Sequence, residues 1–242
     1  MKVGYLLKPF FQIASHMELA EAAANILAND GREDIVSFLY STDGASGRRY
    51  IERLAAGTRA ADLPCSRNYV CTLSHFHHPW THRGYITGRS SAAVAAQLFD
   101  RALSLWQDAK CGEAVFQLGR ALHLLQDIFI PHHSGVTALK GHAALEKWLT
   151  ANWRSFTAEK GGLYHWRRDF YDKDGNCHHA ASENPYDWID HGSHISIAWY
   201  EKYFAAGKYN EDIFLAVAPL IIPFALRFSA GFIALFFRCI KA

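Results

Sequence analysis

The sequence has little net charge and none of the common cysteine motifs. Its 25 lysines and arginines nearly balance 23 aspartates and glutamates, giving a formal charge of only +2. No basic surface for a nucleic-acid backbone is therefore indicated. The five cysteines are an odd number without a Cys-x-x-Cys pair, which excludes a zinc ribbon and a complete disulfide framework. Cys65 and Cys71 can bridge in an oxidising compartment, although two free thiols are the simpler interpretation.

Glycine-rich phosphate loops, repeats and long alternations of apolar and polar residues are also missing. Their absence excludes P-loop nucleotide binding, a repeat architecture and a large half-exposed β-sheet. No linker composition divides the chain, and half of its residues are hydrophobic, which is enough for one large buried core. We therefore expect residues 1–242 to form a single all-α domain, built as a multi-helix bundle with a long metal-bearing loop.

Neither end of the sequence shows a membrane-targeting pattern. The opening residues MKVGYLLKPFF have too short an apolar core for a signal peptide and no small-residue cleavage site. The long apolar run from Phe214 to Phe237 contains Pro219, Pro223 and Arg227, which do not suit a membrane-spanning helix. We expect this run to be a buried core helix and not a transmembrane anchor.

Apolar residues at helical spacing predict helices along most of the chain. The first expected helix begins at a Ser15–Glu18 capping box and ends at Asp30-Gly31. The next helices are expected over Glu33–Tyr40, Arg49–Ala56, Ser90–Lys110, Gly112–Phe129 and Gly141–Ala158. A further helix begins at Pro185 with Asn184 as its cap, and the last covers most of Asp212–Cys239. Asp172–His179 is polar and is interpreted as a surface turn. Gly57–Gly88 lacks regular periodicity, and loops of that length are commonly functional.

The most informative stretch runs from His123 to Glu146. His123 and Asp127 are four residues apart in an apolar helical run, so both side chains lie on one face of a helix. His142 and Glu146 repeat this spacing on the next predicted helix. Imidazole and carboxylate are ligands that suit zinc. A single pair of this kind is commonly an ordinary surface hydrogen bond, but two pairs on apolar helices favour a metal site.

Further histidines lie outside these two pairs. Pro131 lacks a backbone donor and is expected to end the first helix, which leaves His132 and His133 on the turn that follows. His75 belongs to the histidine-rich part of the long loop. His16 falls in the first turn of the first predicted helix and, taken alone, would be an ordinary histidine beside a helix cap.

Together these residues resemble the bacterial zinc-dependent phospholipase C family, whose superfamily also contains single-strand-specific zinc nucleases. The similarity begins with the HxxxD, Pro-x-His and HxxxE motifs between His123 and Glu146. The other matching segments are Asp62, His75-Phe-His-His-Pro79, Asn184-Pro-Tyr-Asp-Trp188-Ile189 and Arg227-Phe-Ser-Ala-Gly231-Phe232. The resemblance thus covers nearly the whole chain, from His16 to about Arg238.

The resemblance implies a centre of three zinc ions. The corresponding ligands are His75, His123 and Asp127 with Asp62 for one ion, His133, His142 and Glu146 for a second, and His16 with the other oxygen of Asp127 for a third. Asp127 would then bridge two ions, and Asp62 would be a ligand or the general base toward the attacking water. Asp62 and Asp127 are thus the expected catalytic residues. His132 is expected to lie behind the ligands or on the surface.

Two elements of the family pattern are missing. In the family an amino-terminal tryptophan completes the third zinc site, whereas this sequence begins with Met1 and has no tryptophan before Trp80. The completion of that site stays open. The residues that cage choline in the best-known members are also not evident, because Leu63 and Thr72 stand near Asp62 and before His75. The headgroup is therefore open as well.

The resemblance implies a phospholipase C that cleaves phospholipids at a membrane surface into diacylglycerol and a phosphorylated headgroup. Zinc ions about 3.5–4 Å apart share a hydroxide nucleophile and neutralise the phosphate oxygens. One alternative is a nuclease or nucleotidase with the same site, for which Trp80, Tyr85, Tyr164 and Trp166 are candidate base-stacking platforms unless they pack within loops. Another is a non-catalytic helical protein that retains zinc. The family further suggests an extracellular or extracytoplasmic location; the oligomeric state is open.

Overall fold

The computed structural model describes residues 13–62, 72–86, 88–138, 141–172 and 174–241. In these residues the fold is all-α, as the sequence predicts. The helices are α1 (Ile13–Asn29), α2 (Glu33–Tyr40), α3 (Tyr50–Ala61), α4 (Ser91–Gln107), α5 (Cys111–Asp127), α6 (Pro131–Ser134), α7 (His142–Asn152), α8 (Pro185–Tyr203) and α9 (Glu211–Cys239), with 3-10 turns η2 (Thr72–His75) and η3 (Trp153–Phe156). A single hairpin of β1 (Arg167–Tyr171) and β2 (Cys177–Ala181) is antiparallel, with Arg167 opposite Ala181.

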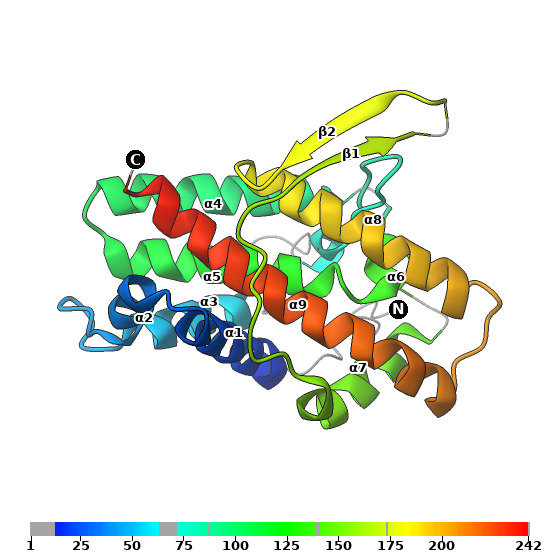
Figure 1. Cartoon of the computed structure of the whole chain (residues 1–242), viewed down its shortest axis with the longest axis horizontal. Helices are drawn as coiled ribbons and strands as arrows, with labels where there is room; N and C mark the ends of the chain where they lie inside the picture. Colours follow the sequence, from blue (N-terminus) through cyan, green and yellow to red (C-terminus); the bar gives the residue numbers. More distant parts are fainter. Residues whose placement is uncertain (1–12, 63–71, 87, 139–140, 173, 242) are drawn as a thin grey trace, which may run out of the picture.

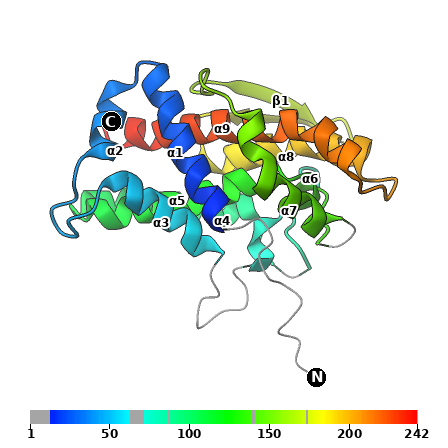
Figure 2. The ribbon, with the colours of Figure 1, turned by 90° about the horizontal axis from the view of Figure 1, so that it is seen from below.

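Helix α5 is the centre of the bundle. It packs against α3 on one side and α4 on another, and α9 crosses in front of it (Figure 1). Figure 2 shows α1 lying between α9 and α3. Nearly every residue of α5 from Leu118 to Asp127 is buried, which is the behaviour of a helix enclosed by neighbours on all sides. The polar residues near its end are therefore held inside the protein.

Two glycines allow α3 and α5 to touch backbone to backbone. A Cβ atom added to Gly57 would lie 2.1 Å from the carbonyl oxygen of Phe116, and one added to Gly119 would lie 2.1 Å from that of Leu54. No larger side chain fits at either position without moving a helix. This close approach carries the end of α3, and Asp62 with it, toward the buried end of α5.

The long apolar run near the end of the chain forms α9. Among the described residues, α9 alone is long and apolar enough to cross a membrane, and 78% of its most apolar window is buried against other parts of the chain. Pro219 and Pro223 lie inside it without ending it. This burial is what we expect of a core helix.

Several sequence-based boundaries are wrong. The helix α1 is already formed at Ile13, so Ser15 lies inside it and the capping box is not used. The helix α3 continues to Ala61, so the irregular segment begins five residues later than Gly57. Cys65 and Cys71 lie outside the described residues. Pro131 does not simply end a helix: α5 stops at Asp127, and Pro131 is the first residue of α6, where its missing N–H has no helical partner to lose.

The hairpin was not predicted. Of the expected turn, Asp172 and Asn176 are joined by a hydrogen bond from the backbone N–H of Asn176 to the Asp172 carboxylate, whereas Cys177–His179 belongs to β2. Most residues of both strands are exposed, Phe170, Ala180 and Ala181 being the exceptions, so the sequence carries too little alternation of apolar and polar residues for strands to be inferred.

The contact between α3 and α5 gives a test of the fold. We expect Gly57→Ala to lower the free energy of unfolding by about 1–3 kcal/mol, because the added methyl group overpacks the contact. The better helix propensity of alanine, worth about 1 kcal/mol, offsets part of that loss. Urea denaturation measures the change. Gly44→Ala is the control, since a Cβ at Gly44 meets no atom within 4 Å. Equal stability of the two variants would contradict the backbone contact.

Candidate metal centre

The structure brings together all eight histidines and carboxylates singled out in the sequence. They are His16 on α1, Asp62 at the end of α3, His75 at the end of η2, His123 and Asp127 on α5, His133 on α6, and His142 and Glu146 on α7. Seven of them are buried, and His142 keeps 12% of its side-chain exposure. The two four-residue spacings in the sequence thus face one interior site, in which His142 has the most exposed side chain.

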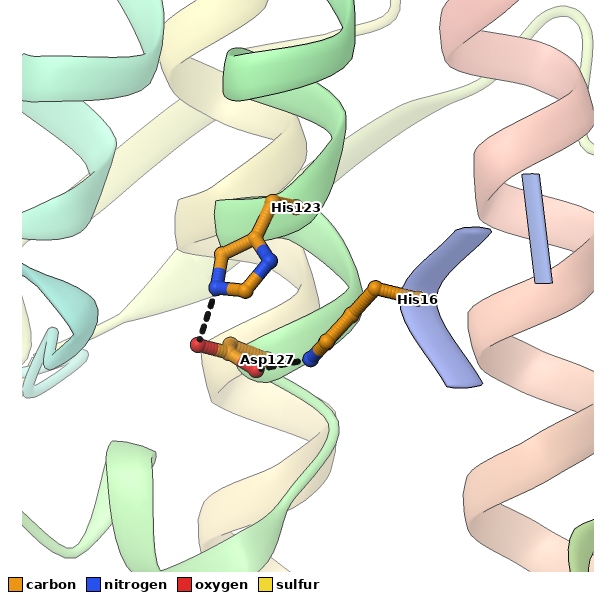
Figure 3. Close-up of side chains that lie close together, drawn as sticks. All are labelled: His16, His123 and Asp127. Atoms are coloured by element: carbon orange, nitrogen blue, oxygen red, sulfur yellow. Dashed lines mark ion pairs between the residues drawn. The ribbon is translucent and has the colours of Figure 1, made fainter. Parts of the chain in front are cut away.

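Asp127 is the hub of the cluster. Its Oδ1 lies 3.2 Å from Nε2 of His16, and its Oδ2 lies 3.1 Å from Nε2 of His123 (Figure 3). The same Oδ2 is 2.6 Å from Nδ1 of His75 and 3.7 Å from Nδ1 of His133. The two carboxylate oxygens therefore face different groups of imidazoles, which is the arrangement of a bridging ligand.

The second carboxylate, Asp62, approaches the same nitrogens of His123 and His75 that face Asp127. Its Oδ1 is 3.3 Å from Nε2 of His123 and 3.9 Å from Nδ1 of His75, and these two nitrogens are 3.4 Å apart. Ligand atoms about 2.0–2.1 Å from a tetrahedral zinc lie about 3.3 Å from one another. The spacing of these three atoms therefore suits a shared cation.

A further group forms around Glu146. Nε2 of His142 is 2.9 Å from Oε1 of Glu146 and 2.8 Å from Nε2 of His133, which is 3.5 Å from the same Oε1. Two imidazole nitrogens that point at each other beside a carboxylate again have the spacing of metal ligands. His142 and Glu146 both point toward this group because His142 is the first residue of α7 and Glu146 lies one turn further on the same face of the helix.

Charge supports a cation at the cluster. Within the described parts of the chain, the ion-pair partners of Asp62, Asp127 and Glu146 are all histidines. Three buried carboxylates without lysine or arginine are costly unless cations neutralise them. The donor set therefore fits divalent metal ions.

The carboxylates are in the form that binds metal. Burial alone would raise the pKa of Asp127, but His123 and His133 hold that pKa well below its usual range. Burial also opposes the ionised form of Glu146, yet His142 and His133 lower its pKa to about 2. Both groups are therefore deprotonated at neutral pH, as metal ligation requires.

The sequence did not identify the supporting residue Gln126, and it did not decide whether His132 lies behind the ligands or on the surface. The amide oxygen of Gln126 accepts a hydrogen bond of 2.8 Å from Nδ1 of His16, which leaves Nε2 of that ring directed at Asp127. The only indication in the sequence is a polar residue inside an apolar helix. His132 is buried and not on the surface, with its ring 4.7 Å from that of Phe204 and 5.3 Å from that of His142.

An all-α bundle that gathers buried histidines and carboxylates at the ends of its helices defines a class of metal-dependent helical proteins. Within that class the chain belongs to the zinc-dependent phospholipase C family, whose model matches residues 15–221. The expectation drawn from the motifs is thereby confirmed at the level of the family.

Solved structures confirm the fold. The chain is similar to the alpha toxin of Clostridium absonum, with a TM-score of 0.73, 16% identity and coverage of 94% of this chain. It is also similar to the alpha-toxin of an avian strain of Clostridium perfringens, with a TM-score of 0.70, 16% identity and 93% coverage. The chain spans 64% and 63% of the lengths of those two proteins. Comparison with curated protein sequences gives no match.

Metal dependence of stability tests the centre. Zinc at a hundredfold excess over its dissociation constant should raise the free energy of unfolding by about 2.7 kcal/mol for each site that it fills. We expect zinc to stabilise Glu146→Gln by the contribution of one site less than it stabilises the starting protein, because an amide oxygen is a weaker ligand than a carboxylate. Urea denaturation of metal-stripped protein with and without zinc measures it. Glu183→Gln, at an exposed position, is the control; equal stabilisation of both variants would show that Glu146 holds no ion.

Proposed function

We propose that the chain is a zinc-dependent phosphodiester hydrolase of the phospholipase C type, which cleaves phospholipids into diacylglycerol and a phosphorylated headgroup. The observation that carries this proposal is the position of Asp127. Its two oxygens face separate groups of imidazoles, and a second carboxylate lies beside one of those groups. Membership in the zinc-dependent phospholipase C family supports the same reaction type.

Three zinc ions would fit the ligand groups. The first group is His75, His123 and Asp127, with Asp62 beside it, the second is His133, His142 and Glu146, and the third is His16 with the other oxygen of Asp127. Bound there, zinc would polarise a phosphoryl oxygen and acidify the attacking water. Residues 1–12, from which the family resemblance implies a further ligand for the third ion, lie outside the described structure.

Asp62 is the proposed proton acceptor. Although burial favours its neutral form, His123 and His16 lower its pKa, so the carboxylate is ionised at neutral pH. Its Oδ1 already lies at the edge of the histidine group, 3.3 Å from Nε2 of His123. A water held at that edge would be within reach of the carboxylate, which could take its proton as the oxygen attacks phosphorus. The bond from phosphorus to the glycerol oxygen would break in the same displacement, and the departing oxygen would take up a proton to give diacylglycerol. Asp127 would hold the histidines on both sides in place.

The aromatic candidates for base stacking are occupied in other contacts. The Tyr164 hydroxyl donates a hydrogen bond of 2.6 Å to Asp30, and Trp166 is buried. The ring of Tyr85 lies 4.9 Å from that of Phe76, and the ring of Trp80 lies 4.5 Å from that of His194. These contacts fit the loop-packing interpretation and favour lipid over nucleic acid as the substrate. A phospholipid substrate is also consistent with the expected extracytoplasmic location, which stays a prediction.

Replacing the proposed base tests the reaction. We expect Asp62→Asn to slow phosphodiester cleavage by about 10²–10⁴-fold, because an amide cannot accept the proton of the attacking water. The fold and the ion at His133, His142 and Glu146 should be retained, since Asp62 does not contact that group. Release of phosphorylated headgroup from short-chain phosphatidylcholine and phosphatidylethanolamine measures the rate, with circular dichroism and elemental analysis alongside.

The matched control is Asp174→Asn, which removes an exposed carboxylate and should leave the rate unchanged. Single-stranded DNA is assayed in parallel with the lipids. Cleavage of DNA but not of lipid by the starting protein would favour the nuclease alternative. A zinc-loaded protein that cleaves neither would favour the non-catalytic one, and an unchanged rate for Asp62→Asn would remove that residue from the mechanism.

A further inference from the structure

A second group of histidines surrounds Asp190, a buried carboxylate of α8. His77 and His82 reach it from the segment between η2 and α4, and His194 lies one turn further along α8. None of these residues belongs to the centre around Asp127. His75 and His77 are two residues apart in an irregular segment, and their side chains contact different carboxylates.

The atoms around Asp190 have the spacing of metal ligands. Its Oδ1 lies 2.8 Å from Nε2 of His77 and 3.1 Å from Nδ1 of His82, close to the separation of about 3.3 Å between ligands of a tetrahedral zinc. Nε2 of His194 lies 3.7 Å from the other oxygen, Oδ2. Ligand atoms of His77, His82 and Asp190 thus lie within 4.8 Å of one another, and a fourth imidazole lies beside them.

A neighbouring hydroxyl holds the imidazole of His77 in place. His77 is fully buried, and its Nδ1 is 2.9 Å from the hydroxyl of Ser90, which leaves Nε2 directed at Asp190. A hydrogen bond from the second ring nitrogen is the usual support of a metal-bound histidine. His82 has a φ of +51°, a left-handed conformation that is unfavourable for residues other than glycine and is often kept at functional sites.

Charge and chemistry indicate the kind of ligand. Asp190 is 7% exposed, and its ion-pair partners among the described residues are histidines alone. A neutral imidazole offers a nitrogen lone pair to a metal ion. Calcium and magnesium prefer oxygen ligands, whereas zinc and its first-row neighbours accept imidazole.

We propose that His77, His82 and Asp190, with His194 as an available fourth ligand, form a separate binding site for a divalent first-row transition metal, zinc being the most suitable. An ion there would join the segment after η2 to α8. The backbone N–H of His77 also donates a 3.2 Å hydrogen bond to the carbonyl oxygen of His133. The ion would therefore fasten the chain segment that lies between the two groups of histidines, without itself meeting the substrate.

Counting ions in matched variants tests the site. His82→Asn removes the most exposed ligand, and asparagine tolerates the left-handed backbone conformation. His165→Asn is the control, since His165 is an exposed histidine outside both clusters. The proteins are dialysed against the same buffered zinc concentration, and zinc per chain is measured by elemental analysis. We expect His82→Asn to hold one ion fewer than the starting protein and His165→Asn to hold the same number.

The same substitution in a Glu146→Gln background separates the two sites. If they are independent, His82→Asn removes one ion in both backgrounds. A loss seen only with Glu146 intact would mean that the ion belongs to the Asp127 centre, and an unchanged count for His82→Asn would mean that Asp190 and its histidines form hydrogen bonds alone. Either result would overturn the proposal. Neither depends on whether the protein cleaves phospholipid.

Discussion

The contacts of Asp127 with histidines are the constraint on which the rest of the structure depends. A buried carboxylate is tolerated only where positive charge or hydrogen-bond donors surround it, so the chain must bring imidazoles to it from several directions. The bundle does so with the ends of helices: Asp127 is the last residue of α5, Asp62 follows α3, and His142 begins α7. Helix ends can present side chains inward without interrupting the apolar packing along the helices themselves.

The local part of the centre could be predicted from sequence, because four-residue spacing on an apolar helix determines which face His123 and Asp127 share. The two pairs of a histidine and a carboxylate, and most of the helices, can be predicted from such periodicity. His16 and Asp62 could be assigned only through the family resemblance, since nothing in their own neighbourhoods distinguishes them from ordinary polar residues. Their approach to His123 depends on tertiary contacts between α1, α3 and α5, which periodicity does not contain.

What could not be predicted has physical reasons as well. Gln126 acts through one hydrogen bond across more than a hundred residues of chain, and no local pattern reports such a contact. Most residues of the hairpin are exposed, and Phe170 and Ala180 are the ones that pack against the core, so its strands carry little of the alternation that burial imposes. Pro131 was interpreted as a helix end because proline interrupts helices, yet the same missing donor suits the first position of α6.

The glycine contact between α3 and α5 also distinguishes the ligands on these two helices from those on α7. Asp62 and His123 are carried by two backbones that touch directly, so their separation cannot adjust by side-chain repacking. His142 and Glu146 belong to α7, which begins after Gly141 in a left-handed conformation and keeps His142 partly in contact with solvent. One wall of the centre is therefore set by direct backbone contact between helices, whereas the other is carried by a separate helix whose first residue is partly exposed.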